Sequence, residues 1–373
     1  MHMNRAEILS GITNIVVKVG TNALTDDGGR LDHQIIRVLA EDIAGLCREK
    51  NIRVTLVSSG AIGAGMAELN LPARPKDLSM LQATAAVGQS LLMRYFAEAL
   101  KPHNLHVGQI LVTRHDFEDR LRYLNLRNCI HALQQSGCLP IINENDAVAV
   151  DEIRFGDNDL IAAHVTNLLQ ADLLILLSVV DGLLDEKGKV QDLVTEMDDS
   201  VTGMVKKEKS SRGTGGMTSK LMAAGTVQTA GEPVIIANGK TPGILGKLLA
   251  GQPLGTLIVP GKRRLSARSR WIALTAKTCG VIVVDAGAAA ALKNNKSLLA
   301  GGIVSTSGDF SPGDAVAIQD ASGNHIARGL TNYSRGDVEK IKGHKSRDFG
   351  ALLGSETWYD EVVHRDDLVI HEA

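Results

Sequence analysis

The sequence predicts an α/β protein in which helices sandwich an open, mostly parallel β-sheet, followed by a small β-rich barrel. Short apolar runs alternate with longer helical patterns over the first two thirds of the 373 residues, which is the pattern of βαβ units. Most runs are continuously apolar, as in strands buried on both faces of a parallel sheet. Aromatic residues make up only 3%, whereas glycine occurs 38 times, so we expect aliphatic cores and many turns.

Length and composition exclude several classes of protein. At about 100–200 residues per domain, the length favours two domains, and 44% hydrophobic residues exclude disorder over most of the chain. The net charge of −2 provides no global field for nucleic acid or an anionic membrane. Four cysteines form no C-x-x-C pair, so neither a zinc ribbon nor a redox motif is indicated. Because no secretory signal and no apolar run of ~18 residues is present, we expect a soluble, cytoplasmic protein with no membrane partner.

The apolar runs predict the strands of the sheet, at residues 15–19, 54–58, 107–113, 139–143, 172–178, 233–237 and 256–259. Apolar side chains at helical spacing predict helices between them, over 35–46, 81–100 and 159–169. In open sheets of this type, ligands bind outside the carboxyl ends of the strands. The chemistry is therefore expected at those ends.

The character of the chain changes near residue 261. Residues 261–270 carry five basic and no acidic side chains, which indicates a linker or a surface hinge. Beyond them the strands become short, and a Ser-Gly-Asn turn at 322–324 between apolar segments predicts a hairpin. We therefore expect a first domain over 1–260, a linker over 261–270 and a β-rich domain over 271–373.

Lys18 lies inside the first apolar run and is followed by Gly20 and Thr21. Burying an unpaired lysine is costly, so an anionic partner is expected. Gly20 would let backbone N–H groups approach a phosphate. The alternative is a lysine on an edge strand whose stem reaches water.

Two further polar regions follow predicted strands. Residues 58–65 put small side chains in a strand-to-helix turn, which favours an anion at the helix N-terminus and equally well suits tight packing. Acidic clusters at 143–146 and 157–159 would bind an α-amino group, hold Mg²⁺ or orient lysines. Alternatively, Asp157 or Asn158 caps the helix that begins near 159.

Residues 213–220, GTGGMTSK, are the most specific local feature. The glycine-rich turn opens a helix expected over 217–230 and puts Lys220 in its first turn, where a polyphosphate would be favoured. The charged segment 206–212 is expected to be mobile, as a loop that covers a substrate would be. An ordinary helix start after a flexible loop is the alternative. Two lysines, glycine-rich turns and acids at strand ends indicate phosphoryl transfer without a Walker motif.

Six segments, taken together and in this order, resemble the amino acid kinase family: VVKVGTNAL, VSSGAIGAG, AVGQ at 86–89, INENDAV, FGDND and GTGGMTSK. Residues 271–373 resemble a PUA domain. Within the family, the chain is similar to the members that transfer the γ-phosphoryl group of ATP to the side-chain carboxylate of L-glutamate, the first step of proline biosynthesis. A kinase of another carboxylate, such as acetylglutamate or aspartate, is the alternative.

The resemblance also implies roles for individual residues. Lys18 and Lys220 would stabilise the transferring phosphoryl group from opposite sides, and Asp159 would orient both lysines. Glutamate would be held by Ser59, Asp146 and Asn158, with Asp157, Asn143 and Gly60 nearby. ATP would be bound by Lys18, Gly20, Thr21, Ser178, Val179, Thr214, Gly215, Gly216, Met217, Thr218, Ser219 and Lys220.

The resemblance implies ATP and Mg²⁺ as cofactors, with Mg²⁺ carried by ATP rather than by protein ligands. It also implies a homodimer or homotetramer and feedback inhibition by proline. The family often has an acidic residue where this chain has Val179. A side-chain contact to the nucleotide from that position is therefore either lost or supplied by Asp181.

RNA binding by the PUA-like tail is an alternative function of a different class. Residues 271–373 contain 10 Lys or Arg against 13 Asp or Glu and so carry a net charge of −3, whereas an RNA-binding face needs a basic patch. A local group keeps the alternative open: Lys340, Lys342, Lys345 and Arg347. A tail that modulates the kinase or its assembly is the other interpretation.

Overall fold

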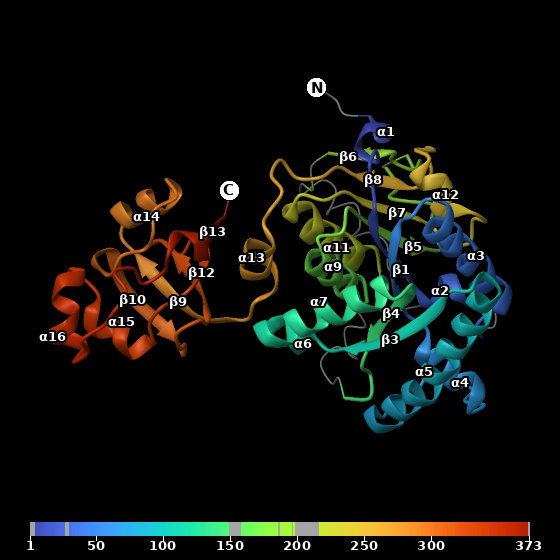
Figure 1. Cartoon of the computed structure of the whole chain (residues 1–373), viewed down its shortest axis with the longest axis horizontal. Coiled ribbons are helices and arrows are strands. Elements are labelled where there is room, and N and C mark those ends of the chain that lie inside the picture. The colour runs from blue at the N-terminus through green and yellow to red at the C-terminus, as the bar shows by residue number, and fades with distance from the viewer. Residues whose placement is uncertain are drawn as a thin grey trace. The chain divides into compact units, whose positions relative to one another are not determined.

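The structure, a computed structural model, describes residues 4–26, 30–148, 158–185, 187–195, 197 and 216–371. It divides the chain into two compact units, each with its own β-sheet (Figure 1). Unit 1 comprises Met1–Asp116 and Leu121–Arg264, and unit 2 comprises Phe117–Arg120 and Leu265–Ala373. Of the helices that the structure describes, none is long and apolar enough to cross a membrane.

An eight-stranded sheet forms the centre of unit 1, in the order β3-β4-β2-β1-β5-β7-β8-β6. The strands from β3 to β7 in that order run parallel, whereas β8 is antiparallel to β7 and parallel to β6. The predicted open, mostly parallel sheet is thereby confirmed. Its strands are β1 (Asn14–Val19), β2 (Arg53–Ser58), β3 (His106–Val112), β4 (Cys138–Glu144), β5 (Leu173–Ser178), β6 (Leu193–Val194), β7 (Val234–Asn238) and β8 (Thr256–Ile258).

Helices cover both faces of this sheet (Figure 1). One face packs against α3 (His33–Glu49), α5 (Leu78–Leu100) and α12 (Ile244–Leu249), which share a continuous apolar core with the strands. The other face carries α9 (Asn158–Leu169) and α11 (Met217–Ala230), which pack against each other. The remaining helices of this part are α1 (Arg5–Ile8), α2 (Thr21–Leu24), α4 (Ala61–Glu68), α6 (Arg114–Glu118) and α7 (Arg120–Gln135), although the last residues of α6 and the first of α7 belong to unit 2.

The alternation of side chains along β1 sets the direction of Lys18. Ile15, Val17 and Val19 join the core beneath α3. Successive side chains of a strand point to opposite faces, so Lys18 points to the face that α9 covers. Because β1 pairs with β2 on one side and with β5 on the other, Lys18 lies on an interior strand, and the edge-strand interpretation is wrong.

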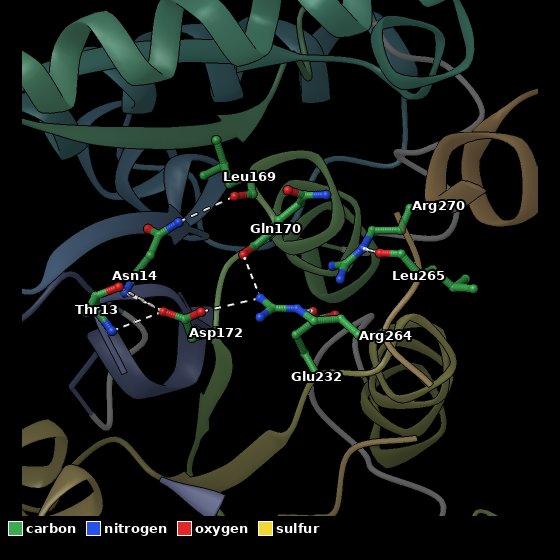
Figure 2. Close-up of polar contacts among 9 residues, drawn as sticks. All are labelled: Thr13, Asn14, Leu169, Gln170, Asp172, Glu232, Arg264, Leu265 and Arg270. Atoms are coloured by element: carbon green, nitrogen blue, oxygen red, sulfur yellow. Dashed lines mark hydrogen bonds and ion pairs between the residues drawn. The ribbon is translucent and has the colours of Figure 1, made fainter. Parts of the chain in front are cut away.

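The last residue of unit 1, Arg264, is tied to the amino ends of the strands (Figure 2). Its guanidinium donates to Glu232 Oε1 at 2.8 Å, to Asp172 Oδ1 at 3.4 Å and to the backbone oxygen of Gln170 at 3.3 Å. Asp172 also accepts hydrogen bonds from the backbone N–H and the hydroxyl of Thr13, just before β1. These contacts lie at the amino ends of the strands, at the opposite end of the sheet from the carboxyl ends of the strands.

Unit 2 contains a five-stranded sheet in the order β10-β9-β11-β12-β13 around a separate apolar core. Antiparallel pairing of β11 with β12 confirms the predicted hairpin. The strands are β9 (Thr278–Val284), β10 (Ile303–Gly308), β11 (Ala315–Gln319), β12 (His325–Leu330) and β13 (Leu368–Ile370). The helices are α13 (Ala267–Arg270), α14 (Ala286–Lys293), α15 (Arg335–Ile341) and α16 (Phe349–Leu353).

Candidate active site

A cavity of about 280 Å³ opens at the carboxyl ends of the central strands of unit 1. This is where an open α/β sheet binds its ligands. The cavity brings together most of the residues that the sequence assigns to the site, namely Lys18, Gly20, Thr21, Ser59, Gly60, Asn143, Asp146, Asn158, Ser178, Val179 and Lys220. Segments that are more than 200 residues apart in the chain thus contribute to one site.

Asp159 joins the two lysines of the cavity. Its Oδ1 atom lies 2.7 Å from Lys18 Nζ, and its Oδ2 atom lies 3.1 Å from Lys220 Nζ. The Asp159 side chain is completely buried, and each lysine side chain is only 6% exposed. Burial would raise the pKa of Asp159, but the two ammonium groups outweigh that effect and lower this pKa below its usual value. These three side chains together carry one negative and two positive charges beside the cavity.

The start of α11 positions Lys220, and the predicted helix over 217–230 is confirmed. Ser219 lies beside Lys220, and its hydroxyl donates to Asp159 Oδ2 at 2.8 Å. Gly216 is the N-cap of α11 and supplies no side-chain hydrogen bond. The residues Gly216, Met217, Thr218 and Ser219 lie at this helix start but outside the lining of the cavity. Thr214, Gly215 and the segment 206–212 lie outside the described residues.

Asn158 connects three elements at the floor of the cavity. Its side-chain amide donates to Ser59 Oγ at 2.9 Å and to Asn143 Oδ1 at 3.1 Å. Asn143 in turn donates to Gln89 Oε1 on α5 at 2.8 Å. The capping interpretation is wrong for Asn158, because this residue is the first of α9 and its side chain bonds to the ends of β2 and β4 instead. Asp157 lies outside the described residues.

Gln89 belongs to this network, although no role was predicted for it. Its side chain is buried on the face of α5 that also carries the apolar Ala85, Leu92 and Phe96. A polar residue on the buried face of an amphipathic helix needs a partner. That pattern is visible in the sequence, so the signal for Gln89 was available.

The turn after β2 lines the cavity, and the helix that follows it packs closely against α5. Ser59 and Gly60 line the cavity, and Gly60 has φ +111°, a left-handed conformation that favours glycine. Gly65 and Gly88 instead allow α4 and α5 to cross at backbone contact. A Cβ atom on Gly88 would lie 1.8 Å from the backbone oxygen of Ala61. The crossing fixes α4, and with it the turn that carries Ser59.

Asp146, which follows β4, and Arg74 provide opposite charges in the lining of the cavity. Burial raises the pKa of Asp146 to about 6, and the positive charge of Arg74 limits the rise. Arg74 lies between α4 and α5. Arg74 was not predicted as a site residue, because an arginine in a polar connection gives no sequence signal.

The opposite side of the cavity is formed by the ends of β1 and β5. Gly20, Thr21, Ser178 and Val179 line it. Val179 is 44% exposed, so an apolar side chain faces the solvent where the family often has an acid. Asp181 lies outside the lining and accepts a hydrogen bond from Asn238 Nδ2 at 2.9 Å, at the end of the neighbouring strand β7.

The arrangement suits the handling of phosphate more than any other chemistry. A transferring phosphoryl group is stabilised by groups of this kind: two ammonium groups held by one carboxylate, backbone N–H groups at glycine turns and a polar floor. Within the described part of the chain, no group of three or more His, Cys, Asp or Glu residues is arranged to hold a metal ion.

Comparison with known proteins identifies the two units. The chain matches the family model "Amino acid kinase family" over residues 14–238 and the model "PUA domain" over residues 280–353. A protein of Caldanaerobacter subterraneus subsp. tengcongensis named glutamate 5-kinase is 47% identical over 96% of this chain and 98% of its own length. Another with this name, from Syntrophus aciditrophicus, is 42% identical over 99% of this chain and 97% of its own length.

A solved structure supports the same fold. N-acetylglutamate synthase from Neisseria gonorrhoeae superposes with a TM-score of 0.51 and 16% identity, covering 70% of this chain and 63% of its own. The predicted kinase fold followed by a PUA domain is confirmed. Because the family model matches more than half of the residues and the relatives span nearly all of them, the chain belongs to the amino acid kinase family.

Proposed function

We propose that this protein transfers the γ-phosphoryl group of ATP to the side-chain carboxylate of L-glutamate, giving glutamyl 5-phosphate, the first step of proline biosynthesis from glutamate. The glutamate 5-kinase relatives, which match along nearly the entire chain, support this substrate. The observation that carries the proposal is the buried pairing of Lys18 and Lys220 through Asp159 at the edge of the cavity.

The reaction needs no general base from the protein. The side-chain carboxylate of glutamate has an ordinary pKa of about 4.3 and is already ionised at neutral pH. One of its oxygens attacks the γ-phosphorus, and the bond between that phosphorus and the β,γ-bridging oxygen breaks, so ADP leaves with that oxygen. Asp159 is therefore assigned to hold the lysines rather than to move a proton.

Lys18 and Lys220 act by charge. The transferring phosphoryl group spreads negative charge over its oxygens, and two ammonium groups set in place beforehand stabilise it without reorganising. The side chains are buried and fixed by Asp159, so they are aimed before the substrates arrive. Mg²⁺, which would come with ATP, would neutralise part of the charge on the phosphates.

ATP and glutamate are assigned to opposite sides of the cavity. On the β1 and β5 side, Gly20, Thr21, Ser178 and Val179 are assigned to ATP together with the start of α11. On the β2 and β4 side, we assign Ser59, Gly60, Asn143, Asp146 and Asn158 to glutamate. We keep Asp157, Thr214 and Gly215, which the structure does not describe, in the same proposed roles.

The test is a hydroxylamine trap of the acyl phosphate, with Mg²⁺, ATP and one acceptor at a time. L-glutamate, N-acetyl-L-glutamate and L-aspartate are compared, because they share a carboxylate and differ in the α-amino group or in length. The proposal expects hydroxamate with L-glutamate alone. Hydroxamate from another acceptor, or none with L-glutamate, would contradict it.

Three finer properties belong to the same proposal. We propose that the enzyme is cytoplasmic, that it forms a homodimer or a homotetramer, and that proline inhibits it. Added proline should lower hydroxamate formation in the same assay, and sedimentation should give a mass of two or four times 39.7 kDa. A monomer, or no response to proline, would remove that part of the proposal.

RNA binding is not proposed for unit 2, because its basic group is largely neutralised. Lys340, Lys342 and Arg347 each lie within 4 Å of an acidic side chain of the same unit, at 3.4, 2.6 and 3.7 Å. A phosphate backbone would have to compete with these carboxylates. Salt-sensitive retention of the chain on RNA would reopen this alternative.

A further inference from the structure

Arg74 lines the cavity from the connection between α4 and α5. Pro72 and Pro75 stand on either side of it. Proline fixes its own φ and restricts the residue before it to an extended conformation, so the backbone at Arg74 is held stiffly although it lies in a loop. Of the residues that the structure describes, none forms a hydrogen bond or ion pair with its guanidinium.

The other two cations of the described lining have partners already. Lys18 and Lys220 both contact Asp159, beside the assigned path of the phosphoryl group. Arg74 instead acts electrostatically on Asp146, which follows β4. Since β2 separates β4 from β1 in the sheet, Asp146 belongs to the side of the cavity remote from β5. Arg74 thus provides positive charge on the glutamate side.

Glutamate brings three charges into this space. Its side-chain carboxylate has to reach the phosphoryl group beside the lysines. Its α-ammonium and α-carboxylate groups are attached to one carbon atom, so the groups that recognise them have to be neighbours. Asp146 and Arg74 are such neighbours, with the opposite signs that the two α-groups require.

We infer that Arg74 binds the α-carboxylate of glutamate while Asp146 binds the α-ammonium group, so that Arg74 determines specificity for a free amino acid. This inference rests on the proposed function, because it takes glutamate as the acceptor. The inference adds Arg74 to the proposed glutamate site and predicts a selectivity. Because of the positive charge of Arg74, an acceptor whose α-carboxylate is masked should be a poorer substrate than glutamate.

The test compares L-glutamate with its α-amide, which keeps the side-chain carboxylate and the α-ammonium group but lacks the negative α-carboxylate that would bind Arg74. Wild-type protein, Arg74→Gln and the matched control Lys76→Gln are assayed with both acceptors. Lys76 is an exposed cation two residues further along the same connection, outside the lining.

Removing a charged hydrogen-bond partner reduces binding by about 10- to 100-fold. Arg74→Gln should lose about that factor in kcat/KM for L-glutamate, mostly through KM, and almost nothing for the α-amide. The preference for glutamate over the α-amide should therefore collapse, whereas Lys76→Gln should keep it. Unchanged turnover of the α-amide also shows that the variant is folded.

Three outcomes would overturn the inference. Arg74→Gln with the wild-type preference would show that Arg74 does not contact the α-carboxylate. A rise in the KM for ATP, with equal losses for both acceptors, would place Arg74 on the phosphates instead. Wild-type protein without turnover of L-glutamate would remove the proposed function itself, and the assignment of Arg74 with it.

Discussion

Replacing Asp159 by asparagine should destabilise unit 1 strongly, although the two side chains have the same shape. The carboxylate is completely buried and lies 2.7 Å and 3.1 Å from two ammonium groups. At an effective dielectric constant of about 20, Coulomb's law gives about 6 and about 5 kcal/mol for these two contacts. Desolvation of the three ions offsets most of this attraction, and breaking a buried pair costs about 3–5 kcal/mol net.

The cost should appear as a lower melting temperature. For a unit of this size, 1 kcal/mol corresponds to about 2–4 °C, so Asp159→Asn should lower the Tm by about 6–20 °C. Far-UV circular dichroism follows the helices, which lie mostly in unit 1. Fluorescence of the two tryptophans, Trp271 and Trp358, reports on unit 2, so that the two transitions can be assigned.

The same variant makes a prediction about pH. The lysines hold the pKa of Asp159 below its ordinary value of 3.8, against the effect of burial. A carboxyl group with a lowered pKa in the folded protein contributes stability above 3.8 and loses it as the pH falls through the folded pKa. The stability difference between wild type and Asp159→Asn should therefore be constant between pH 5 and 8 and shrink in stronger acid.

A surface pair supplies the control. Glu41 lies 3.8 Å from Arg37 on α3, and both side chains are more than half exposed. Glu41→Gln should change the free energy of unfolding by no more than about 0.5 kcal/mol. If Asp159→Asn were as stable as Glu41→Gln, the idea that Asp159 compensates two buried ammonium groups would be refuted.

Changes at four other places should each have a distinct effect. Lys220→Ala should lower kcat by about 10²- to 10³-fold with the circular dichroism spectrum unchanged; near-normal kcat would rule out its role. Because the pKa of Asp146 is raised to about 6, the KM of the wild type for glutamate should rise about tenfold per pH unit below pH 6. This rise should disappear in Asp146→Asn. Gly88→Ala should cost at least about 1–3 kcal/mol, since its Cβ would meet the backbone of α4; a wild-type Tm would contradict the crossing. A chain ending at residue 270 should keep its kinase activity, and a folded but inactive truncation would assign part of the catalysis to unit 2.

The sequence was sufficient for the sheet of unit 1 because strands buried on both faces read as continuous apolar runs. Each expected strand has its counterpart, from β1 to β8. The short strand β6 was missed, since its two residues, Leu193–Val194, pair with β8 only through tertiary contacts. The reversed direction of β8 was not predictable either, because an apolar run carries no information about strand direction.

The candidate site was predictable where residue type and position coincide. Lys18 and Lys220 stand out because one lies in an apolar strand and the other opens a helix after glycines. That a single carboxylate 61 residues before Lys220 joins them came from the family resemblance, not from spacing. Arg74 reaches the cavity through the path of a loop, and no local pattern encodes such a path.

The proposed phosphoryl transfer is tested most directly by following an oxygen atom from glutamate to phosphate. L-glutamate labelled with ¹⁸O in its side-chain carboxylate is incubated with ATP, Mg²⁺ and hydroxylamine, and the released phosphate is analysed by mass spectrometry. If the side-chain carboxylate attacks the γ-phosphorus, its oxygen bridges carbon and phosphorus. Hydroxylamine then attacks the carbon, so the phosphate leaves with one ¹⁸O atom, while label in the α-carboxylate stays out of it. Unlabelled phosphate from the side-chain-labelled substrate would mean that water attacks ATP, and would contradict the account.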